Sequence, residues 1–379
     1  MFPMSPGMRF FLLRTFGMAN SISNNSHHLI QADVDFILSK VGSELLELRG
    51  QHLFVTGGTG FFGHWLLDTL QRANRVLDLG VEVTVLTRDI TLFKNQADYL
   101  FADESFHFIE GDIRNFEWPK GTFKTIIHAA TTRAEETFNH EDALKKFETV
   151  SQGTQRLLQF ACKAGTEKIL WTSSGAVYGQ QPAELERISE TYSGCVESMD
   201  PDRAALGLGK RVAEFYCAYY GQKHGIDIKI ARCFSFVGPR MQMNIHYAIG
   251  NFIADEVSGK EIVVTGDGTP IRSYLYIADL IIWLWTILLR GQSLYPYNVG
   301  SDEAVNMADL ARLVSDCGGR GNRIQILKDN KSGLPINRYL PDLTRIKSSL
   351  GVRAFFTLQA AIQKTIEYER CELGLPVAN

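Results

Sequence analysis

A glycine-rich loop near the start of the chain, residues 57–63 (GGTGFFG), has the spacing of a dinucleotide site. It follows an apolar run at 53–56 and precedes a segment with helical periodicity at 64–70. In a strand, turn and helix of this kind, the glycines permit a tight turn, close approach of a pyrophosphate to the backbone, and close packing of helix on strand. The predicted cofactor contacts in this loop are Gly57, Gly60, Phe61, Phe62 and Gly63.

The end of the second β-rich segment bears on which dinucleotide binds. Sites for NAD usually carry an acidic residue there, which holds the ribose 2′-hydroxyl. Thr87 occupies that position, and Arg88 beside it could pair with a 2′-phosphate. The pattern favours NADP, with NAD as the alternative, while a solvent-facing role for Arg88 stays open.

Two further segments are expected along the same cofactor. Asp112 and Ile113 follow the third β-rich segment, where they are placed to contact the adenine. Ala129 and Ala130 follow the fourth, where small residues let the chain pass under the cofactor. Each signal is weak alone, but together they occur in the order that a dinucleotide-binding fold requires.

These residues need a sheet that brings strand ends to one edge, and the chain carries the pattern for one. Short β-rich runs alternate with helical stretches, which is typical of a parallel, doubly wound α/β sheet, the Rossmann fold. Before it, apolar residues at three- and four-residue steps predict a helix over 32–48. The expected strands are His52–Thr56, Glu82–Thr87, Phe106–Glu110, Thr125–His128, Lys168–Thr172 and Asp227–Cys233.

The expected organisation has three parts: a disordered leader over residues 1–30, a dinucleotide-binding domain over 31–240, and a smaller α/β substrate-binding lobe over 241–379. Beyond Pro239 the alternation loosens into helices, turns and short strands. The motif YPYNVG at 295–300 predicts a strand that returns to the main sheet. Because no low-complexity linker separates the two larger parts, we expect them to share an interface and a cleft.

Later motifs occur in a recognisable order: WTSSGAVYG at 171–179, GKRVAE at 209–214, RCFSFVGP at 232–239, GDGTPIRSYLYIADL at 266–280 and YNVG at 297–300. With the glycine loop, they resemble the extended short-chain dehydrogenase/reductase family, in its nucleotide-sugar epimerase/dehydratase branch. The resemblance runs from about Leu48 almost to the C-terminus. Several ordered motifs are far more specific than one glycine loop.

The resemblance implies chemistry at C4 of a nucleoside-diphosphate sugar, where a nicotinamide oxidises the hydroxyl and the 4-keto intermediate is epimerised, dehydrated or reduced. Ser174 matches the serine or threonine that hydrogen-bonds the reacting oxygen. Lys210 matches the lysine that holds the nicotinamide ribose and lowers the pKa of the base. Ser235 falls where a polar residue faces the substrate, and Arg272 where an arginine clamps the diphosphate.

One position departs from the family's pattern. The tyrosine expected four residues before the lysine is Leu206, which has no titratable group. Loss of a general base typically costs about 10²- to 10⁴-fold in rate. Tyr178 and Tyr192 are candidates for a substitute base, provided that their hydroxyls lie within hydrogen-bond reach of the proton.

The turn after Ser174 narrows the reaction type. Dehydratases of the family carry an Asp-Glu pair directly after this residue, and decarboxylating relatives use a glutamate in the turn, but this chain has Gly175 and Ala176. We therefore expect a 4-epimerase or 4-ketoreductase, impaired or atypical because of Leu206. Two alternatives stay open: an inactive member that binds cofactor and nucleotide-sugar as a binding or partner subunit, and a substitution or sequencing variant within an active protein.

The composition of the chain limits the other classes of protein to which it could belong. Hydrophobic residues make up 45% of the 379 residues and charged residues 21%, with a net charge of −3. These values are typical of an ordinary globular protein and show no basic excess for nucleic-acid binding. Six widely spaced cysteines and the absence of clustered histidines indicate free thiols rather than disulfides or a metal site.

Nothing in the sequence predicts a membrane protein. The longest apolar run, Leu280–Leu289, is too short to span a bilayer and predicts a buried helix. The N-terminal segment has an apolar patch interrupted by Arg14 and no clear cleavage site, so we expect a cytoplasmic protein. By resemblance we also expect a homodimer, formed through the helices near 143–158 and 210–222.

Overall fold

A seven-stranded parallel sheet lies at the centre of the molecule. The computed structural model describes residues 6–132, 142–194, 196–243, 245, 247–329 and 336–376, with the backbone alone for residues 6–25. The strand order is β11-β6-β5-β4-β1-β2-β3, and all neighbours are parallel, which confirms the predicted doubly wound fold. The strands are β1 (His52–Thr56), β2 (Glu82–Thr87), β3 (Phe106–Glu110), β4 (Thr125–His128), β5 (Lys168–Ser174), β6 (Asp227–Cys233) and β11 (Tyr297–Val299).

The first six of these strands coincide with the six predicted from sequence, except that β5 continues to Ser174. Such strands can be recognised because both of their faces are buried, so their sequences are nearly continuous apolar runs. In β1, Leu53 packs into the core on one face of the sheet, whereas Phe54 packs into the core on the other. This alternation fixes which helices each strand supports.

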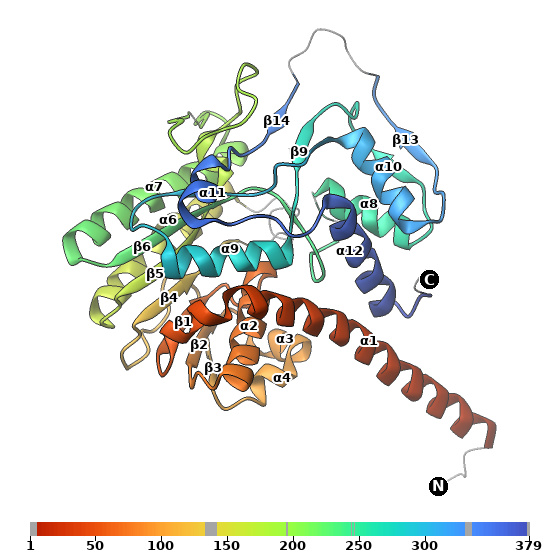
Figure 1. Cartoon of the computed structure of the whole chain (residues 1–379), viewed down its shortest axis with the longest axis horizontal. Coiled ribbons are helices and arrows are strands. Elements are labelled where there is room, and N and C mark those ends of the chain that lie inside the picture. The colour runs from red at the N-terminus through yellow and green to blue at the C-terminus, as the bar shows by residue number, and fades with distance from the viewer. Residues whose placement is uncertain are drawn as a thin grey trace.

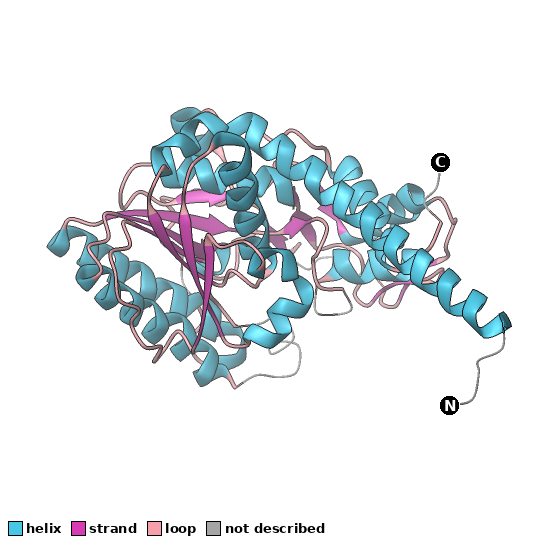
Figure 2. Cartoon of the chain, turned by 90° about the horizontal axis from the view of Figure 1, so that it is seen from below, coloured by secondary structure: helices cyan, strands magenta, loops and turns pink. Residues whose placement is uncertain are grey.

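Helices cover both faces of the sheet (Figure 2). On one face lie α1 (Pro6–Leu45), α2 (Phe61–Leu77) and α9 (Ile277–Arg290), whose apolar residues share one core with Leu53. On the other lie α6 (Ala143–Lys163) and α7 (Pro201–His224), which pack against each other (Figure 1). Two short helices, α3 (Ile90–Gln96) and α4 (Asp98–Phe101), connect β2 to β3.

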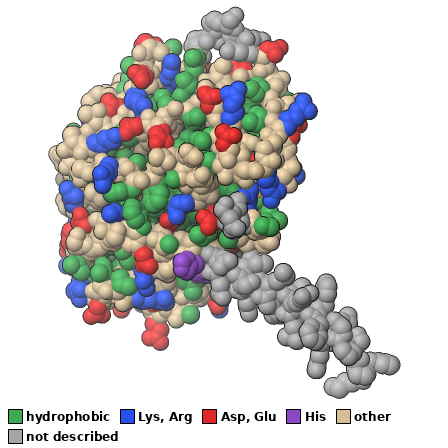
Figure 3. Space-filling model, turned by 45° about the vertical axis from the view of Figure 1, so that its right-hand side comes forward, with side chains coloured by type: hydrophobic (Ala, Val, Ile, Leu, Met, Phe, Trp, Pro, Cys, Tyr) green, Lys and Arg blue, Asp and Glu red, His purple; other side chains and the backbone are tan. Residues whose placement is uncertain are grey.

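Helix α9 accounts for the longest apolar run of the sequence. Every residue from Ile277 to Leu289 is buried, because the helix lies between the sheet and α1. Among the described helices, none is both long and apolar enough to cross a membrane. On the side of the surface shown in Figure 3, acidic, basic and hydrophobic side chains are interspersed.

Helix α1 extends further toward the N-terminus than the helix predicted over 32–48. It begins at Pro6, so most of the residues expected to form a disordered leader are helical in the structure, while residues 1–5 lie outside the described part of the chain. Its buried stripe includes Ile37 and packs on α2 and α9. Asp33 in this helix accepts a hydrogen bond from the Tyr276 hydroxyl and pairs with Lys364 at 3.1 Å.

Within the described residues, the second half of the chain forms three small sheets and further helices. Helix α9 packs on the main sheet and β11 is one of its strands. The second half of the chain therefore contributes to both the lobe and the central sheet. The β11 strand lies inside the segment 295–300 and pairs with β6. The remaining elements are β7 (Phe236–Val237), α8 (Ala248–Val257), β8 (Ile262–Val264), β9 (Ile271–Ser273), β10 (Leu275–Tyr276), β12 (Ala304–Asn306), α10 (Met307–Gly318), β13 (Ile324–Ile326), β14 (Arg338–Tyr339), α11 (Thr344–Leu350) and α12 (Leu358–Glu372).

Candidate functional site

A cleft of about 1420 Å³ runs along the carboxyl ends of the sheet strands and under the lobe. This is the edge of a doubly wound sheet at which ligands bind. The structure brings every site residue predicted from the sequence to the wall of this cleft. They are Gly57, Gly60, Phe61, Phe62, Gly63, Thr87, Arg88, Asp112, Ile113, Ala129, Ala130, Ser174, Lys210, Ser235 and Arg272.

The glycine loop is folded tightly against the end of β4. Gly57 has a φ of +71°, and a Cβ there would lie 2.4 Å from the backbone carbon of Ala129. A Cβ on Gly63 would lie 2.1 Å from the Gly57 oxygen. Gly60 is the N-cap of α2, so the positive end of that helix dipole faces the cleft. The loop can therefore hold an anionic group close to its backbone.

Polar groups at the ends of β2 and β3 form one end of the cleft. Asp112 accepts hydrogen bonds from both the Nε and Nη2 of Arg114, each at 2.9 Å, and these bonds lower the pKa of its carboxyl. The charge of Arg88 lowers that pKa further, so Arg88 and Asp112 face the same space. The Thr87 hydroxyl accepts a bond from the Asp89 backbone N–H at 3.3 Å, and Asp89 caps α3.

Lys210 is a buried cation in the wall of the cleft. Its Nζ donates to the Thr172 carbonyl at 2.6 Å and lies 4.8 Å from the ring centroid of Trp171. Burial lowers the pKa of Lys210 to about 8. No ion pair of the described residues involves Lys210, so its ammonium charge is available to a bound molecule.

His128, the last residue of β4, lies near Lys210, and its surroundings prevent it from acting as a base. Its Nδ1 lies 2.5 Å from the Thr56 hydroxyl and its Nε2 lies 3.2 Å from the Thr154 hydroxyl. Burial, reinforced by the charge of Lys210, lowers the pKa of His128 to about 3. The imidazole is therefore neutral and both nitrogens are engaged.

Ser174 ends β5 at the cleft and starts a short 3₁₀ turn over Gly175–Tyr178. Its hydroxyl accepts the Ala176 backbone N–H at 3.1 Å. A Cβ on Gly175 would lie 2.4 Å from the hydroxyl oxygen of Tyr339, which does not line the cleft. The sequence did not point to Tyr339, since it comes from β14, far along the chain.

Leu206 lies in the wall of the cleft, on α7 one turn before Lys210, and its partly buried side chain packs against the core. Its side chain brings an apolar group without a titratable proton to this part of the wall. Neither proposed substitute is arranged as a base. The Tyr178 hydroxyl donates to Asn298 Oδ1 at 2.7 Å and accepts from Arg232 Nη1 at 2.9 Å, and Tyr192 does not line the cleft.

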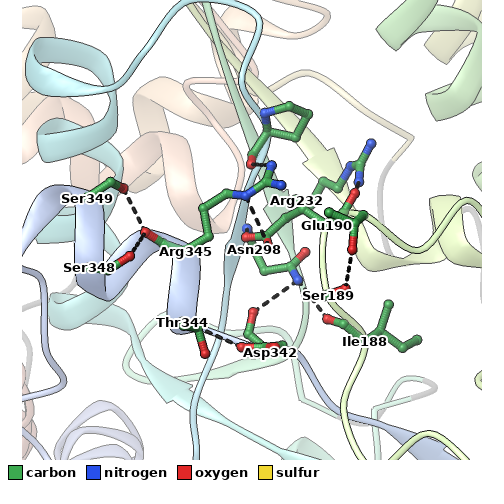
Figure 4. Close-up of polar contacts among 12 residues, drawn as sticks. Ile188, Ser189, Glu190, Arg232, Asn298, Asp342, Thr344, Arg345, Ser348 and Ser349 are labelled. Carbon is green, nitrogen blue, oxygen red and sulfur yellow. Dashed lines mark hydrogen bonds and ion pairs between the residues drawn. The ribbon is translucent and has the colours of Figure 1, made fainter.

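A polar network under the cleft joins segments that are distant in sequence (Figure 4). Asn298 is buried, and its Nδ2 donates to the carbonyls of Ile188 and Asp342. Its backbone N–H donates to Glu190, whose carboxylate lies 3.6 Å from Arg345. The network fixes the chain on both sides of β11, and no sequence motif indicated more than its asparagine.

Ser235 and Arg272 lie at the lobe side of the cleft. Arg272 Nη1 donates to the carbonyls of Ile271 and Asn337, at 2.8 and 3.2 Å. No ion pair among the described residues involves this guanidinium, and burial lowers its pKa. An arginine of this kind in a cleft wall is suited to an anionic ligand. No cluster of metal-ligating side chains occurs in the described ranges.

Comparisons with known proteins identify the family and the relatives of this chain. Residues 53–300 match the NAD dependent epimerase/dehydratase family. UDP-glucuronic acid decarboxylase 1 of Xenopus tropicalis is 31% identical over 329 residues, which cover 87% of this chain and 74% of the relative. UDP-glucuronic acid decarboxylase 6 of Arabidopsis thaliana is 30% identical over 324 residues, covering 86% and 90%.

The fold is shared with solved structures. A dTDP-glucose 4,6-dehydratase from Streptomyces venezuelae, solved with NAD bound, is 26% identical with a TM-score of 0.70, covering 85% of this chain and 98% of that one. The region that matches the family includes the glycine loop, the strand that ends at Ser174 and the helix that carries Lys210.

Proposed function

Because the chain belongs to the NAD dependent epimerase/dehydratase family, we propose that it is an NAD(P)-dependent nucleotide-sugar 4-epimerase or 4-ketoreductase. The observation that carries the proposal is the meeting of Gly60, Ser174, Lys210 and Arg272 in one cleft. These residues supply a dinucleotide loop, a hydroxyl, a buried cation and an anion-binding guanidinium, each from a different part of the chain.

The cleft fits a nicotinamide dinucleotide. The loop at Gly57 and Gly63 has no room for a side chain, so its backbone is free to face a pyrophosphate, and Lys210 is buried without a carboxylate partner among the described residues. A nicotinamide bound here would supply hydride transfer at C4 of the sugar. Lys210 would hold the ribose, Ser174 would hydrogen-bond the oxygen on C4, and Arg272 would bind the diphosphate and so orient the sugar.

The turn at Gly175 and Ala176 supports this reaction type over elimination or decarboxylation. Neither side chain can act as an acid or base, whereas the corresponding dehydratases and decarboxylases of the family use acidic groups there. The relatives named above include UDP-glucuronic acid decarboxylases, so UDP-glucuronic acid belongs among the substrates to be tested.

We propose NADP as the preferred cofactor, with NAD as the alternative. Thr87 stands where an acidic residue would repel a 2′-phosphate, and Arg88 beside it supplies a positive charge that also acts on Asp112. The related dehydratase was solved with NAD, so both cofactors are to be compared in the test.

The second candidate function is a non-catalytic member that retains both ligands. Leu206 favours it, because the described cleft wall carries no phenol at that point of α7. Both candidates predict cofactor and nucleotide-sugar binding, and turnover separates them.

The test begins with the purified protein and identification of its bound cofactor after release. Absorbance of reduced nicotinamide is then followed with UDP-, GDP-, CDP- and dTDP-sugars, including UDP-glucuronic acid. Leu206→Tyr should raise turnover by about 10²- to 10⁴-fold if the missing base limits the rate. Leu206→Phe is the matched control, because it adds the ring without the hydroxyl.

Each outcome has a distinct meaning. Turnover restored by Tyr but not by Phe supports a dehydrogenase site with a missing base. Equal rates in wild type and Leu206→Tyr would show that the base is not limiting. Binding without turnover in all three proteins would favour the non-catalytic candidate.

We also propose that the protein is a cytoplasmic homodimer. Five described cysteines are free thiols, as suits a reducing compartment, while Cys195 lies outside the described residues. Several large side chains of α6 and α7 are exposed, including Leu144, Phe215 and Tyr219. Light scattering across micromolar concentrations should give twice the chain mass, and Phe215→Glu should reduce it to that of a monomer.

A further inference from the structure

Lys146 is a buried lysine in the cleft wall that no sequence motif indicated. It lies on α6, only 8% of its surface is exposed, and its side chain lines the cleft. No hydrogen bond or ion pair among the described residues involves its Nζ. Because an ammonium is costly to bury without a partner, such a group is suited to contact an oxygen of a bound molecule.

The packing of α6 on α7 sets the level of this lysine in the cleft. Both helices follow neighbouring parallel strands, β4 and β5, and cover one face of the sheet, so they run side by side in the same direction (Figure 1). They come close at Gly209, where a Cβ would lie 3.2 Å from the Cβ of Val150 and 3.3 Å from the carbonyl oxygen of Phe147. One turn toward the start of each helix from this contact are Leu206 and Lys146. The two residues therefore lie at the same level, and both line the cleft.

The other titratable groups on this side of the cleft have different places or partners. Among the described cleft residues of β5, β6, α6 and α7, such groups belong to Lys146, Lys210 and Cys233. Lys210 is engaged by a backbone carbonyl, and Cys233 packs into the core on the opposite face of the sheet. Tyr274 lies across the cleft on the lobe, two residues from the arginine expected to bind the diphosphate. Of these described groups, Lys146 is the uncommitted one beside Leu206.

We propose that Lys146 transfers the proton at the sugar oxygen, in place of the phenol that Leu206 does not provide. The inference rests on the proposed function. In ketone reduction, C4 of the sugar receives a hydride from the reduced cofactor, and the π electrons of the C=O bond move onto the oxygen. That oxygen takes a proton from the Lys146 ammonium, which is left as a neutral amine and is reprotonated by solvent. Oxidation of the alcohol follows the same steps in reverse.

The side chains around Lys146 suit this division of tasks. Leucine is shorter than tyrosine and carries no hydroxyl, so Leu206 leaves proton transfer to a side chain from another element. A lysine has a long, flexible stem and three donor hydrogens, and lysines act as general acids and bases in enzymes. Lys210, one turn further along α7, holds the cofactor ribose in the proposed function. One lysine then binds the cofactor while the other moves the proton.

The test compares Lys146→Met and Lys146→Arg in the wild type and in Leu206→Tyr, with the same sugar panel and nicotinamide readout. In the wild-type background, Lys146→Met should lower kcat by about 10²-fold or more and change KM little. Lys146→Arg should be equally slow, because arginine keeps the charge but does not release a proton. In the Leu206→Tyr background both losses should shrink to below about tenfold, because the introduced phenol then moves the proton.

Lys145→Met is the matched control, since Lys145 is the exposed neighbour on the same helix and does not line the cleft. It should leave kcat unchanged within about twofold, the range expected for a surface substitution. Thermal unfolding and cofactor content check the fold of every variant. Lys146→Met should melt no lower than the wild type, because it removes a buried charge that has no partner among the described residues.

Each result supports or overturns the inference. No loss, or a loss equal in both backgrounds, overturns it, because a purely structural lysine would cost the same in both. Wild-type turnover in Lys146→Arg, or a change in KM alone, also overturns it and assigns the lysine to anion binding. A silent wild type beside an active Leu206→Tyr overturns it while still supporting the proposed function. If no sugar changes nicotinamide absorbance in either background, the proposed function itself fails.

Discussion

The cofactor half and the sugar half of the cleft are built in opposite ways. The cofactor half comes from consecutive strand-turn units, with contacts supplied by residues 57–63, 87–88, 112–113 and 129–130. The sugar half is assembled from residues on β5, α7 and β9, which are far apart in the chain. The first half depends on backbone shape that local sequence dictates, whereas the second depends on tertiary packing.

The strongest test of this comparison is a pair of glycine substitutions in one loop. Gly63→Ala should abolish cofactor binding and lower the free energy of unfolding by about 3 kcal/mol, because its Cβ meets the Gly57 oxygen at 2.1 Å. Gly60→Ala should leave the fold intact, since the new Cβ would lie 3.4 Å from its nearest neighbour, the Gly57 oxygen. It should still weaken cofactor binding, because the Cβ crowds the pyrophosphate. Denaturant unfolding and released-cofactor measurements check both. Equal stability of the two variants would contradict the account of the loop.

The pH dependence of the rate tests Lys210, which lies where the cofactor half and the sugar half of the cleft meet. With a pKa of about 8, Lys210 is charged below that pH and becomes neutral as the pH rises through it. Initial rates and cofactor retention should therefore fall about tenfold between pH 7 and 9, following the charged fraction. Lys210→Arg, which stays protonated, should flatten this profile. A wild-type profile without a change near pH 8 would contradict the lowered pKa of Lys210.

The smallest expected effect concerns cofactor choice at the far end of the cofactor half. Thr87→Asp should shift the ratio of NADP to NAD affinity toward NAD by about tenfold, the size of one charge-assisted hydrogen bond. Thr87→Ser retains the hydroxyl and should leave the ratio unchanged. Titration of NADP and of NAD into the cofactor-free protein measures this ratio of affinities. An unchanged ratio in Thr87→Asp would remove the argument for NADP.

The same division explains how much could be predicted from the sequence. Six strands and the glycine loop were predicted almost to the residue, because apolar runs and glycine spacing are local signals. The site residues were found by motif order, and the structure gathers them in one cleft. The approach of Tyr339 to Gly175 was missed, since the two residues of β14 carry no periodic pattern and their place depends on pairing with a distant strand.

The full length of α1 could not be predicted from the sequence pattern either. Apolar periodicity marked only the part over 32–48, where the stripe that includes Ile37 is buried. Toward Pro6 the helix continues without that pattern, so a leader was the natural prediction. Tyr178 and Tyr192 illustrate the remaining gap, because no sequence shows whether a tyrosine hydroxyl is free or committed to partners such as Asn298.

The link between Asp33, Tyr276 and Lys364 gives helix α1 a role beyond covering the sheet. It ties the first helix to the segment before α9 and to α12 near the end of the chain. These two helices, distant in sequence, thus hold each other in place. Loosening that link should expose buried residues of both helices, because they share one core.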